Sequence, residues 1–382
     1  MSALFLFRKT TTWTLIGVLF FSLSACRNNQ QTTDPNAENT PQEEEIEELL
    51  ILENATLNQI DSQGNTLWQL YGEKAVYRQD DQNAEIEEVT GELYESGEVF
   101  LKIEANEGKI IDDGEQINLQ GEVVATDPRN GAVLKSEKIE WYPQDKLLVI
   151  PQPLTGTHPR FQASANEGKY YTDREQLDLI GNVEGVAKNP RLELQGELVS
   201  WFIPQETVKS PRPLQVDRYD PETETVSDRV TANSGEVKLD KKIVSLEENV
   251  AFNSSDPKLQ ATSNAITWEV EKKLITSRQP IQVFQEDITL SGNQGTVDLN
   301  TEVAEFQGDV KGVSQENQAT LFANQLRWNL PTEEIEATGN VVYQQQNPPL
   351  TTKGEKASGI LQEENITVQG TEEERVVTEI VP

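Results

Sequence analysis

The stretch Ala105-Asn106-Glu107-Gly108, with the run that follows it to Trp141, sets the pattern of this 382-residue chain. Similar runs begin near Gly168, Gly235 and Gly295, and in every copy a tryptophan follows the glycine after 33 residues. The glycine and tryptophan pairs are Gly108 and Trp141, Gly168 and Trp201, Gly235 and Trp268, and Gly295 and Trp328. Scattered tryptophans would not keep one distance, so the chain contains an internal repeat of about 60 residues, which is typical of stacked arrays.

Two further apolar positions recur inside each repeat. A large apolar residue lies 11 positions after the glycine and a valine lies 15 positions after it. These residues are Leu119, Leu179, Leu246 and Phe306, and Val123, Val183, Val250 and Val310. Around them apolar and polar residues alternate, which predicts strands with one apolar and one solvated face. We therefore expect an all-β protein.

The N-terminus carries a targeting signal. Arg8 and Lys9 precede an apolar run from Trp13 to Leu23, and Leu23-Ser24-Ala25-Cys26 ends it. This is similar to a bacterial lipoprotein signal over residues 1–26, with Cys26 as the lipid anchor; an uncleaved membrane anchor is the alternative. We expect residues 27–50 to be a disordered acidic tether, with some helical tendency over Glu43–Leu52, and 371–382 to be a tail.

Composition narrows the classes of function. With 65 acidic against 32 basic residues, the net charge of −33 argues against nucleic-acid binding, which requires a basic surface. The single Cys leaves no disulfide within the chain, and we expect His158, the only histidine, to be a surface turn residue. We predict no catalytic residues, no metal site and no cofactor. Composition leaves two alternatives open. One is a β-helical, glycan-active enzyme, although the repeat length argues against it. The other is a structural lipoprotein.

Several motifs carry a family resemblance. Ile-Asn-Leu-Gln-Gly-Glu-Val at 117–123 with Leu-Lys-Ser-Glu-Lys-Ile-Glu-Trp at 134–141 resembles the OstA-type β-jellyroll, as do 303–310 and 321–328. This is the fold of the lipopolysaccharide export bridge, the LptC/LptA/OstA-like family. An N-terminal anchor followed by Gly64, Trp68–Leu70 and Ala75–Tyr77 is most similar to LptC. A typical LptC has about half this length and a transmembrane anchor, so the chain resembles the extended LptC-like proteins of cyanobacteria.

The resemblance implies an elongated OstA/LptA-like β-jellyroll, LptC-like over 51–216 and LptA/OstA-like over 217–370. It implies a periplasmic bridge component rather than an enzyme, anchored by its N-terminus to a membrane. Arg27, after the cysteine, does not distinguish the two membranes, and the resemblance favours the inner one. The implied partners are lipopolysaccharide, the inner-membrane export ABC transporter, and an outer-membrane translocon or LptA-like jellyroll. Partner jellyrolls would pair with outer strands near Trp68–Tyr77 and Ile366–Gly370.

Each repeated position has two possible roles. The eight residues 11 and 15 positions after the glycines are candidates for lining a lipid groove, and the alternative is an ordinary core. For the four tryptophans we favour core packing over lipid contact. The four glycines are expected to form a bulge or bend. A lipid conduit requires an open apolar groove along the whole array, whereas closed and packed rolls would favour a scaffold.

Overall fold

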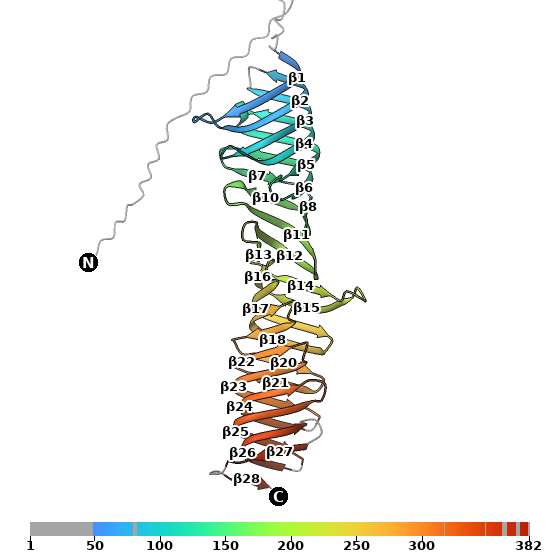
Figure 1. Cartoon of the computed structure of the whole chain (residues 1–382), viewed down its shortest axis with the longest axis vertical. Coiled ribbons are helices and arrows are strands. Elements are labelled where there is room, and N and C mark those ends of the chain that lie inside the picture. The colour runs from blue at the N-terminus through green and yellow to red at the C-terminus, as the bar shows by residue number, and fades with distance from the viewer. Residues whose placement is uncertain are drawn as a thin grey trace, which may run out of the picture. The chain divides into compact units, whose positions relative to one another are not determined.

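The computed structural model describes residues 49–78, 82–316, 318–347, 349–360, 365–371 and 375–380. The chain divides into two compact units, Met1–Ile46 and Glu47–Pro382. The first unit lies outside the described residues, and so do Cys26, the signal and almost all of the expected tether. The described residues of the second unit form 28 strands in one continuous antiparallel sheet, stacked in chain order (Figure 1). The predicted all-β jellyroll is confirmed.

The strands fall into an opening group, two groups of repeats and a closing group. The opening strands are β1 (Leu49–Ile60), β2 (Thr66–Arg78), β3 (Asn83–Glu95) and β4 (Glu98–Ile111), followed by the turn η1 (Asp112–Gly114). Next come β5 (Gln116–Thr126), β6 (Val133–Tyr142), β7 (Leu147–Ile150), β8 (Leu154–His158), β9 (Phe161–Ala165), β10 (Glu167–Tyr171), the turn η2 (Thr172–Arg174), β11 (Gln176–Lys188), β12 (Arg191–Phe202), β13 (Thr207–Ser210), β14 (Leu214–Tyr219), β15 (Val226–Ala232) and β16 (Ser234–Lys238). Then follow β17 (Ile243–Ser255), β18 (Lys258–Glu269), β19 (Leu274–Ser277), β20 (Ile281–Gln285), β21 (Ile288–Gly292), β22 (Gln294–Asp298), β23 (Val303–Ser314) and β24 (Ala319–Asn329). The closing strands are β25 (Glu334–Gln346), β26 (Pro349–Ile360), β27 (Asn365–Gln369) and β28 (Val377–Ile380).

Prolines divide some of the strands in two. Pro153 separates β7 from β8, Pro213 separates β13 from β14, and Pro280 separates β19 from β20. Proline has no N–H to donate to a ladder, so a strand breaks where it stands. The matching residue of the fourth repeat is Asn340, and there β25 continues through a bulge.

Five of the long strands, β5, β11, β17, β23 and β25, bend at a bulge of two left-handed residues. These pairs have φ between +47° and +81° and are Gly121–Glu122, Gly181–Asn182, Glu248–Asn249, Gly308–Asp309 and Gly339–Asn340. The ladder register shifts at every one of them. The asparagine of the repeated signature holds the bend, because the N–H of Asn166 donates to the Gly181 carbonyl at 2.9 Å and that of Asn293 to the Gly308 carbonyl at 2.8 Å.

The bulge therefore does not lie where we expected it, at the four repeat glycines. It comes 13 residues later, and Gly108, Gly168, Gly235 and Gly295 pair directly with the large apolar residue 11 positions on. A Cβ on Gly235 would lie 2.4 Å from Cδ2 of Leu246. These glycines leave room for a neighbouring core side chain rather than bend the chain.

One of the two expected outer strands differs from expectation, whereas Ile366–Gly370 falls at β27, an outer strand as expected. β1 pairs with β2 and forms the first edge, so Trp68–Tyr77 lies in an inner strand between β1 and β3. Residues 49–52 extend β1, where we had expected helical tendency, because Leu49–Ile60 pairs along its length with β2. At the other end β27 and β28 both pair with β26.

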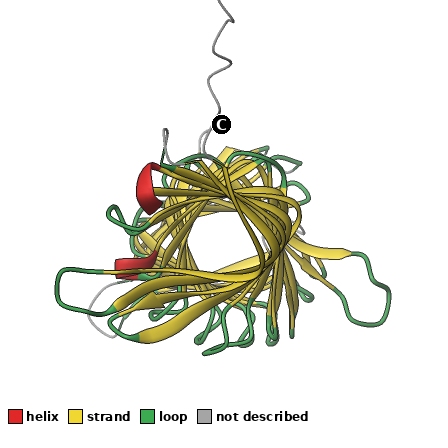
Figure 2. Cartoon of the chain, turned by 90° about the horizontal axis from the view of Figure 1, so that it is seen from above, coloured by secondary structure: helices red, strands yellow, loops and turns green. Residues whose placement is uncertain are grey.

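The strands wind around a common axis (Figure 2), and their buried apolar side chains form two core clusters. One cluster runs from Trp68 to Trp201, and the other from Leu192 to Ala357. Leu194, Val208 and Leu239 pack against both clusters. The predicted boundary at 216/217 stays a prediction, since the sheet continues through β14 and β15 without a break.

Candidate functional site

The eight predicted groove residues all lie inside the roll. Their exposed fractions range from 0% to 5%: Leu119 0%, Val123 0%, Leu179 5%, Val183 2%, Leu246 1%, Val250 2%, Phe306 1% and Val310 1%. The expected groove, open to solvent along the array, is therefore not what the structure has at these positions. The physical reason is closure, because the two rows of strand ends approach and contact each other.

The strand ends form two rims that meet along a seam. We call the turns after β1, β3, β5 and β8 the first rim, and those after β4, β6, η2 and β12 the second rim. Four contacts cross between them: Gln59 Nε2 donates to the Asp113 carbonyl at 3.0 Å, Lys146 Nζ to Glu95 at 2.7 Å and Arg129 Nη1 to Glu175 at 3.2 Å, and Arg160 pairs with Glu206. The side chains of the three ion pairs are 22% to 61% exposed, so their hydrogen bonds compete with water.

Beneath the bridged seam lies an apolar cavity of about 150 Å³. Its wall takes residues from β4 to β16 and includes Leu179, Val183 and Trp201 from the sequence predictions. The three residues that pack against both core clusters, Leu194, Val208 and Leu239, also line it. The cavity therefore occupies the place where the two clusters meet.

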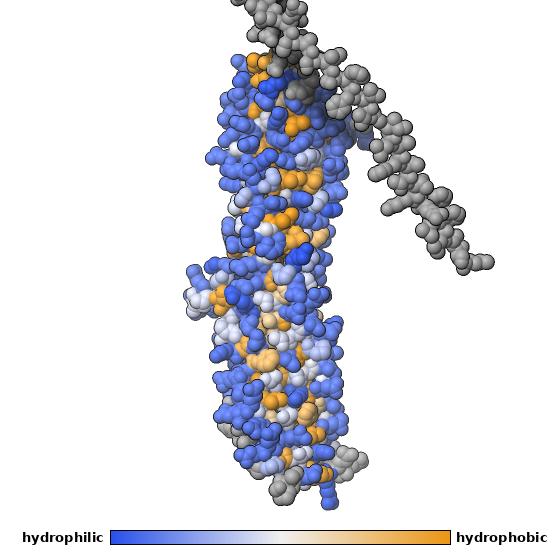
Figure 3. All heavy atoms as spheres, turned by 180° about the vertical axis from the view of Figure 1, so that it is seen from behind, coloured by the Kyte–Doolittle hydropathy of each residue, from blue (hydrophilic) through white to orange (hydrophobic). Residues whose placement is uncertain are grey.

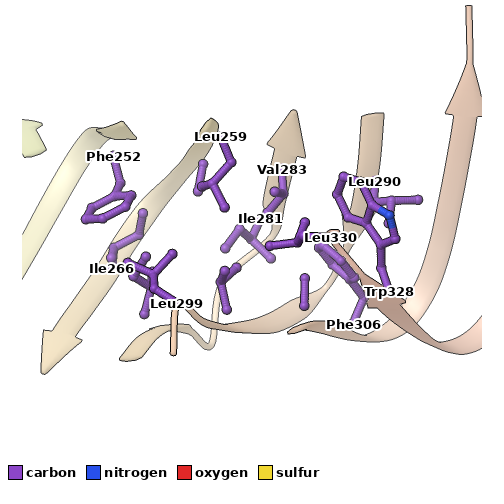
Figure 4. Packing of buried hydrophobic residues seen from close by; sticks show 14 of the residues in the cluster. Phe252, Leu259, Ile266, Ile281, Val283, Leu290, Leu299, Phe306, Trp328 and Leu330 are labelled. Carbon is purple, nitrogen blue, oxygen red and sulfur yellow. The ribbon is translucent and has the colours of Figure 1, made fainter. Parts of the chain in front are cut away.

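Small residues create this cavity. Ala125, Ala132, Gly156, Ala163 and Gly185 line it, and a Cβ built on Gly156 would meet nothing within 4 Å. In the third repeat the position equivalent to Gly185 is Phe252, which is fully buried among other apolar side chains such as Leu259 and Ile266 (Figure 4). Its ring packs edge-on against that of Trp268, with ring centroids 5.5 Å apart. The same template is therefore hollow in the second repeat and filled in the third. The repeat pattern alone did not indicate this difference, but a comparison of Gly185 with Phe252 in the sequence could have done so.

The comparison with known families agrees with this architecture. A family model described as "Lipopolysaccharide-assembly, LptC-related" matches residues 15–188 and 213–316, more than half of the chain. The chain belongs to the LptC-related family. Membership implies a role in lipopolysaccharide transport or assembly, and it points to a transport protein rather than an enzyme. No curated protein matches the chain.

In this LptC-related protein the cavity has an aromatic wall that sequence reasoning missed. His158 stacks on Phe161 at 4.9 Å, and Phe161 meets Trp201 edge-on at 4.4 Å. His158 is thus a half-buried wall residue, and not the plain surface residue we expected, because its strand β8 turns that face inward. Burial lowers the pKa of His158, and the positive charge of Arg160 lowers it further.

A second group at the seam consists of Asp127, Arg129 and Tyr170, and the sequence did not single it out as part of a site. The buried Asp127 accepts from Arg129 Nε at 3.0 Å and Nη2 at 2.7 Å, and from the backbone N–H of Arg129 at 2.9 Å. This fixes the guanidinium where it can reach Glu175 on the other rim. Tyr170 lies beside it on the cavity wall, 8% exposed, and its hydroxyl has no hydrogen-bond partner.

The four repeat tryptophans lie in the interior of the LptC-related roll. Their exposed fractions are 3%, 9%, 0% and 0% for Trp141, Trp201, Trp268 and Trp328. None of their indole N–H groups has a hydrogen-bond partner, whereas Trp68 donates to Gln59 at 2.9 Å. An unpaired buried donor costs free energy, so packing holds these rings in place.

Other predicted features add little to the site. Lys138 and Lys272 pair with Glu140 and Glu269, so their charges are already partnered. Within the described ranges, no helix is long and apolar enough to cross a membrane, and no group of His, Cys, Asp or Glu could hold a metal ion. On one face of the second unit, apolar side chains gather in a strip between polar flanks (Figure 3).

Proposed function

We propose that this chain is a bridge component that carries lipopolysaccharide in its apolar interior, from an inner-membrane ABC transporter toward the outer membrane. The observation that carries the proposal is the apolar cavity under the seam. Acyl chains need a water-excluding track, and a charged head group must stay in solvent. A roll with a seam offers both, since the chains lie inside and the head group outside.

The cavity sets a condition on transport. A dry apolar cavity of about 150 Å³ holds a molecule of roughly the size of benzene, far less than an acylated lipid. The seam must therefore part for cargo to enter. Exposed ion pairs contribute about 0–1 kcal/mol each, whereas each buried methylene contributes about 0.8 kcal/mol. A few methylenes thus outweigh the three ion pairs that bridge the rims.

Anchoring and partners belong to the same proposal. The chain would be periplasmic and held to the inner membrane through its N-terminus, with Cys26 as the lipid-bearing residue. Its outer strands, β1 at one end and β27 or β28 at the other, would pair with the jellyrolls of the transporter and of an outer-membrane translocon or LptA-like protein. Exposed Leu50 and Ile51 on β1 suit such an interface.

Photocrosslinking in cells tests the conduit. A probe at Leu179, in the cavity wall, should form a lipopolysaccharide adduct that is lost when ATP is depleted. A probe at Asn182, three residues away at the outer bend, should form none. Gly156→Leu adds a side chain to the cavity wall at a position where a Cβ meets nothing within 4 Å, and it should abolish the Leu179 adduct. An adduct at Asn182 of equal strength would contradict an interior route.

A disulfide across the seam tests the entry route. Arg160→Cys with Glu206→Cys replaces one ion pair by a covalent link. The oxidised protein should lose the Leu179 adduct and recover it on reduction. The matched Arg160→Ser with Glu206→Ser variant, which also removes the ion pair, should keep it. Equal adducts in the oxidised and reduced forms would mean that cargo enters through the ends of the roll.

A structural scaffold is the second candidate. It is favoured by the packed interior around Phe306 and Trp328, which are 1% and 0% exposed. A probe at Phe306 separates the two functions. A lipid adduct there places cargo as far as the fourth repeat, whereas intramolecular crosslinks at both Leu179 and Phe306 would identify the interior as core only.

A further inference from the structure

The cavity wall contains two buried polar groups without hydrogen-bond partners among the described residues. They are the hydroxyl of Tyr170 and the indole N–H of Trp201. Leu177 on β11 pairs with Tyr170 on β10 and with Trp201 on β12, so the two residues flank Leu177 on one face of the sheet. An indole can only donate, and a hydroxyl can donate. Both atoms are buried beneath the cavity surface, so a ligand reaches these donors only when the parted seam lets the wall rearrange, and a ligand that suits them brings an acceptor.

The charges around Tyr170 decide which acceptor fits. Arg129 already uses Nε and Nη2 on Asp127 and Nη1 on Glu175. One guanidinium against two carboxylates leaves this corner net negative. A phosphate or a free carboxylate would be repelled there, whereas a neutral carbonyl would not.

The protonation of Tyr170 suits a donor. Burial, the main cause, raises its pKa from 10.0 to about 12, and the positive charge of Arg129 opposes this rise. The hydroxyl therefore keeps its proton throughout the physiological range.

We propose that the Tyr170 hydroxyl donates a hydrogen bond to the ester or amide carbonyl that joins an acyl chain to its head group, with the alkyl chain in the apolar cavity. The inference rests on the proposed function and deepens it. It makes Tyr170 a registration point, that is, a residue that binds the acyl linkage and so fixes the position of the lipid along the roll. The anionic head group stays outside the seam.

The test uses chain-matched small amphiphiles and the full-length protein. Methyl octanoate and N-methyloctanamide carry a neutral carbonyl, octyl methyl sulfide lacks one, and octanoate and octyl phosphate are anionic. Affinities are measured by ligand-observed NMR. Tyr170→Phe should weaken ester and amide binding about five- to tenfold, the loss of one buried hydrogen bond, and leave sulfide binding unchanged. Tyr171→Phe, on the outward face of the same strand, is the matched control and should change none of them.

Infrared spectroscopy supplies a second readout. The carbonyl stretch of bound methyl octanoate should shift to lower frequency in the unmodified protein, and the shift should vanish in Tyr170→Phe. Equal ester affinity and an unshifted carbonyl in both proteins would overturn the registration point, with the conduit intact if the sulfide still binds. Tighter binding of octanoate or octyl phosphate that depends on Tyr170 would make it an anion site instead. If no amphiphile binds, the proposed function fails as well.

Discussion

The second and third repeats share one template but differ inside. In the second, Gly185 faces a cavity and the rims above it are joined by Arg129–Glu175 and Arg160–Glu206. In the third, Phe252 occupies the equivalent position. The ion pairs at its strand ends, such as Lys242–Glu271, join neighbours along one rim. Among the described residues, no ion pair crosses the seam beyond Arg160–Glu206.

This difference teaches that the repeat fixes the path of the backbone and leaves the interior free to vary. Glycines, bulges and tryptophans recur wherever a strand must bend or close. The other inward-facing side chains of a repeat decide whether the interior of that repeat, here called a level of the roll, contains a cavity or is fully packed. A hollow level has lost packing contacts, and two of the three cross-rim ion pairs, Arg129–Glu175 and Arg160–Glu206, lie above the cavity.

The largest effect is expected from Phe252→Ala, which would give the third repeat the hollow of the second. Phe252 is 0% exposed, and removal of a buried phenyl ring costs about 3–5 kcal/mol, because transfer energy and a residual cavity both contribute. Denaturant unfolding followed by tryptophan fluorescence measures the loss. Gly185→Ala is the matched control and should change stability by less than about 1 kcal/mol. A loss below about 1 kcal/mol for Phe252→Ala would show that the two levels are equally deformable.

A smaller loss should follow from Asp228→Ala, at the junction of the two regions. Asp228 pairs with Arg218 on the inward face, with side chains 0% and 12% exposed. Removing the carboxylate leaves a guanidinium poorly solvated, which costs about 3 kcal/mol. Lys272→Ala removes an exposed ion pair and should cost less than about 0.5 kcal/mol in the same assay. Equal losses would show that the Arg218 head reaches solvent.

The strand pattern was predictable because it depends on spacing. Alternation around Leu119 and Val123 correctly indicated buried faces, and the 33-residue interval correctly indicated a stacked β array. The assignment of the bulge to the four repeat glycines was wrong, because more than one residue type can form a bend. A bend is made by Gly181–Asn182 in one repeat and by Glu248–Asn249 in another, so glycine alone did not mark it.

The site was less predictable than the fold. A cavity arises from the summed smallness of residues on different strands, such as Gly156 and Gly185, and no motif records that sum. The partners Arg129 and Glu175 lie 46 residues apart and meet only after closure of the roll. His158 seemed exposed for the same reason, since its turn meets Trp201 only in three dimensions.

Alkaline pH should weaken the hollow region before the packed one. The pKa of Tyr170 is raised from 10.0 to about 12, chiefly by burial, so folding favours its neutral form. This contribution is complete below pH 10 and is lost as the unfolded state alone ionises between pH 10 and about 12. The loss is at most about 2–3 kcal/mol. Hydrogen exchange should show β10 and β11 opening before β23 and β24 over this range. In Tyr170→Phe the two pairs of strands should no longer open in this order as the pH rises. If the order of opening is unchanged in this variant, groups other than Tyr170 cause it.

The smallest effect concerns a bulge at which the repeats differ. Glu248 has φ +63° where three other repeats have glycine, and a side chain in the left-handed region is strained. Glu248→Gly should therefore stabilise the third repeat by about 0.5–1 kcal/mol, read from the denaturant midpoint. Glu247→Gly, one residue earlier in ordinary strand geometry, should lose a similar amount, because glycine there gains only unfolded-state entropy. If both variants lose stability, contacts of the Glu248 side chain outweigh its backbone strain. The Asn233 N–H donates to the Glu248 carbonyl at 2.9 Å. In that case this hydrogen bond would not be the only interaction that stabilises the bend of the third repeat.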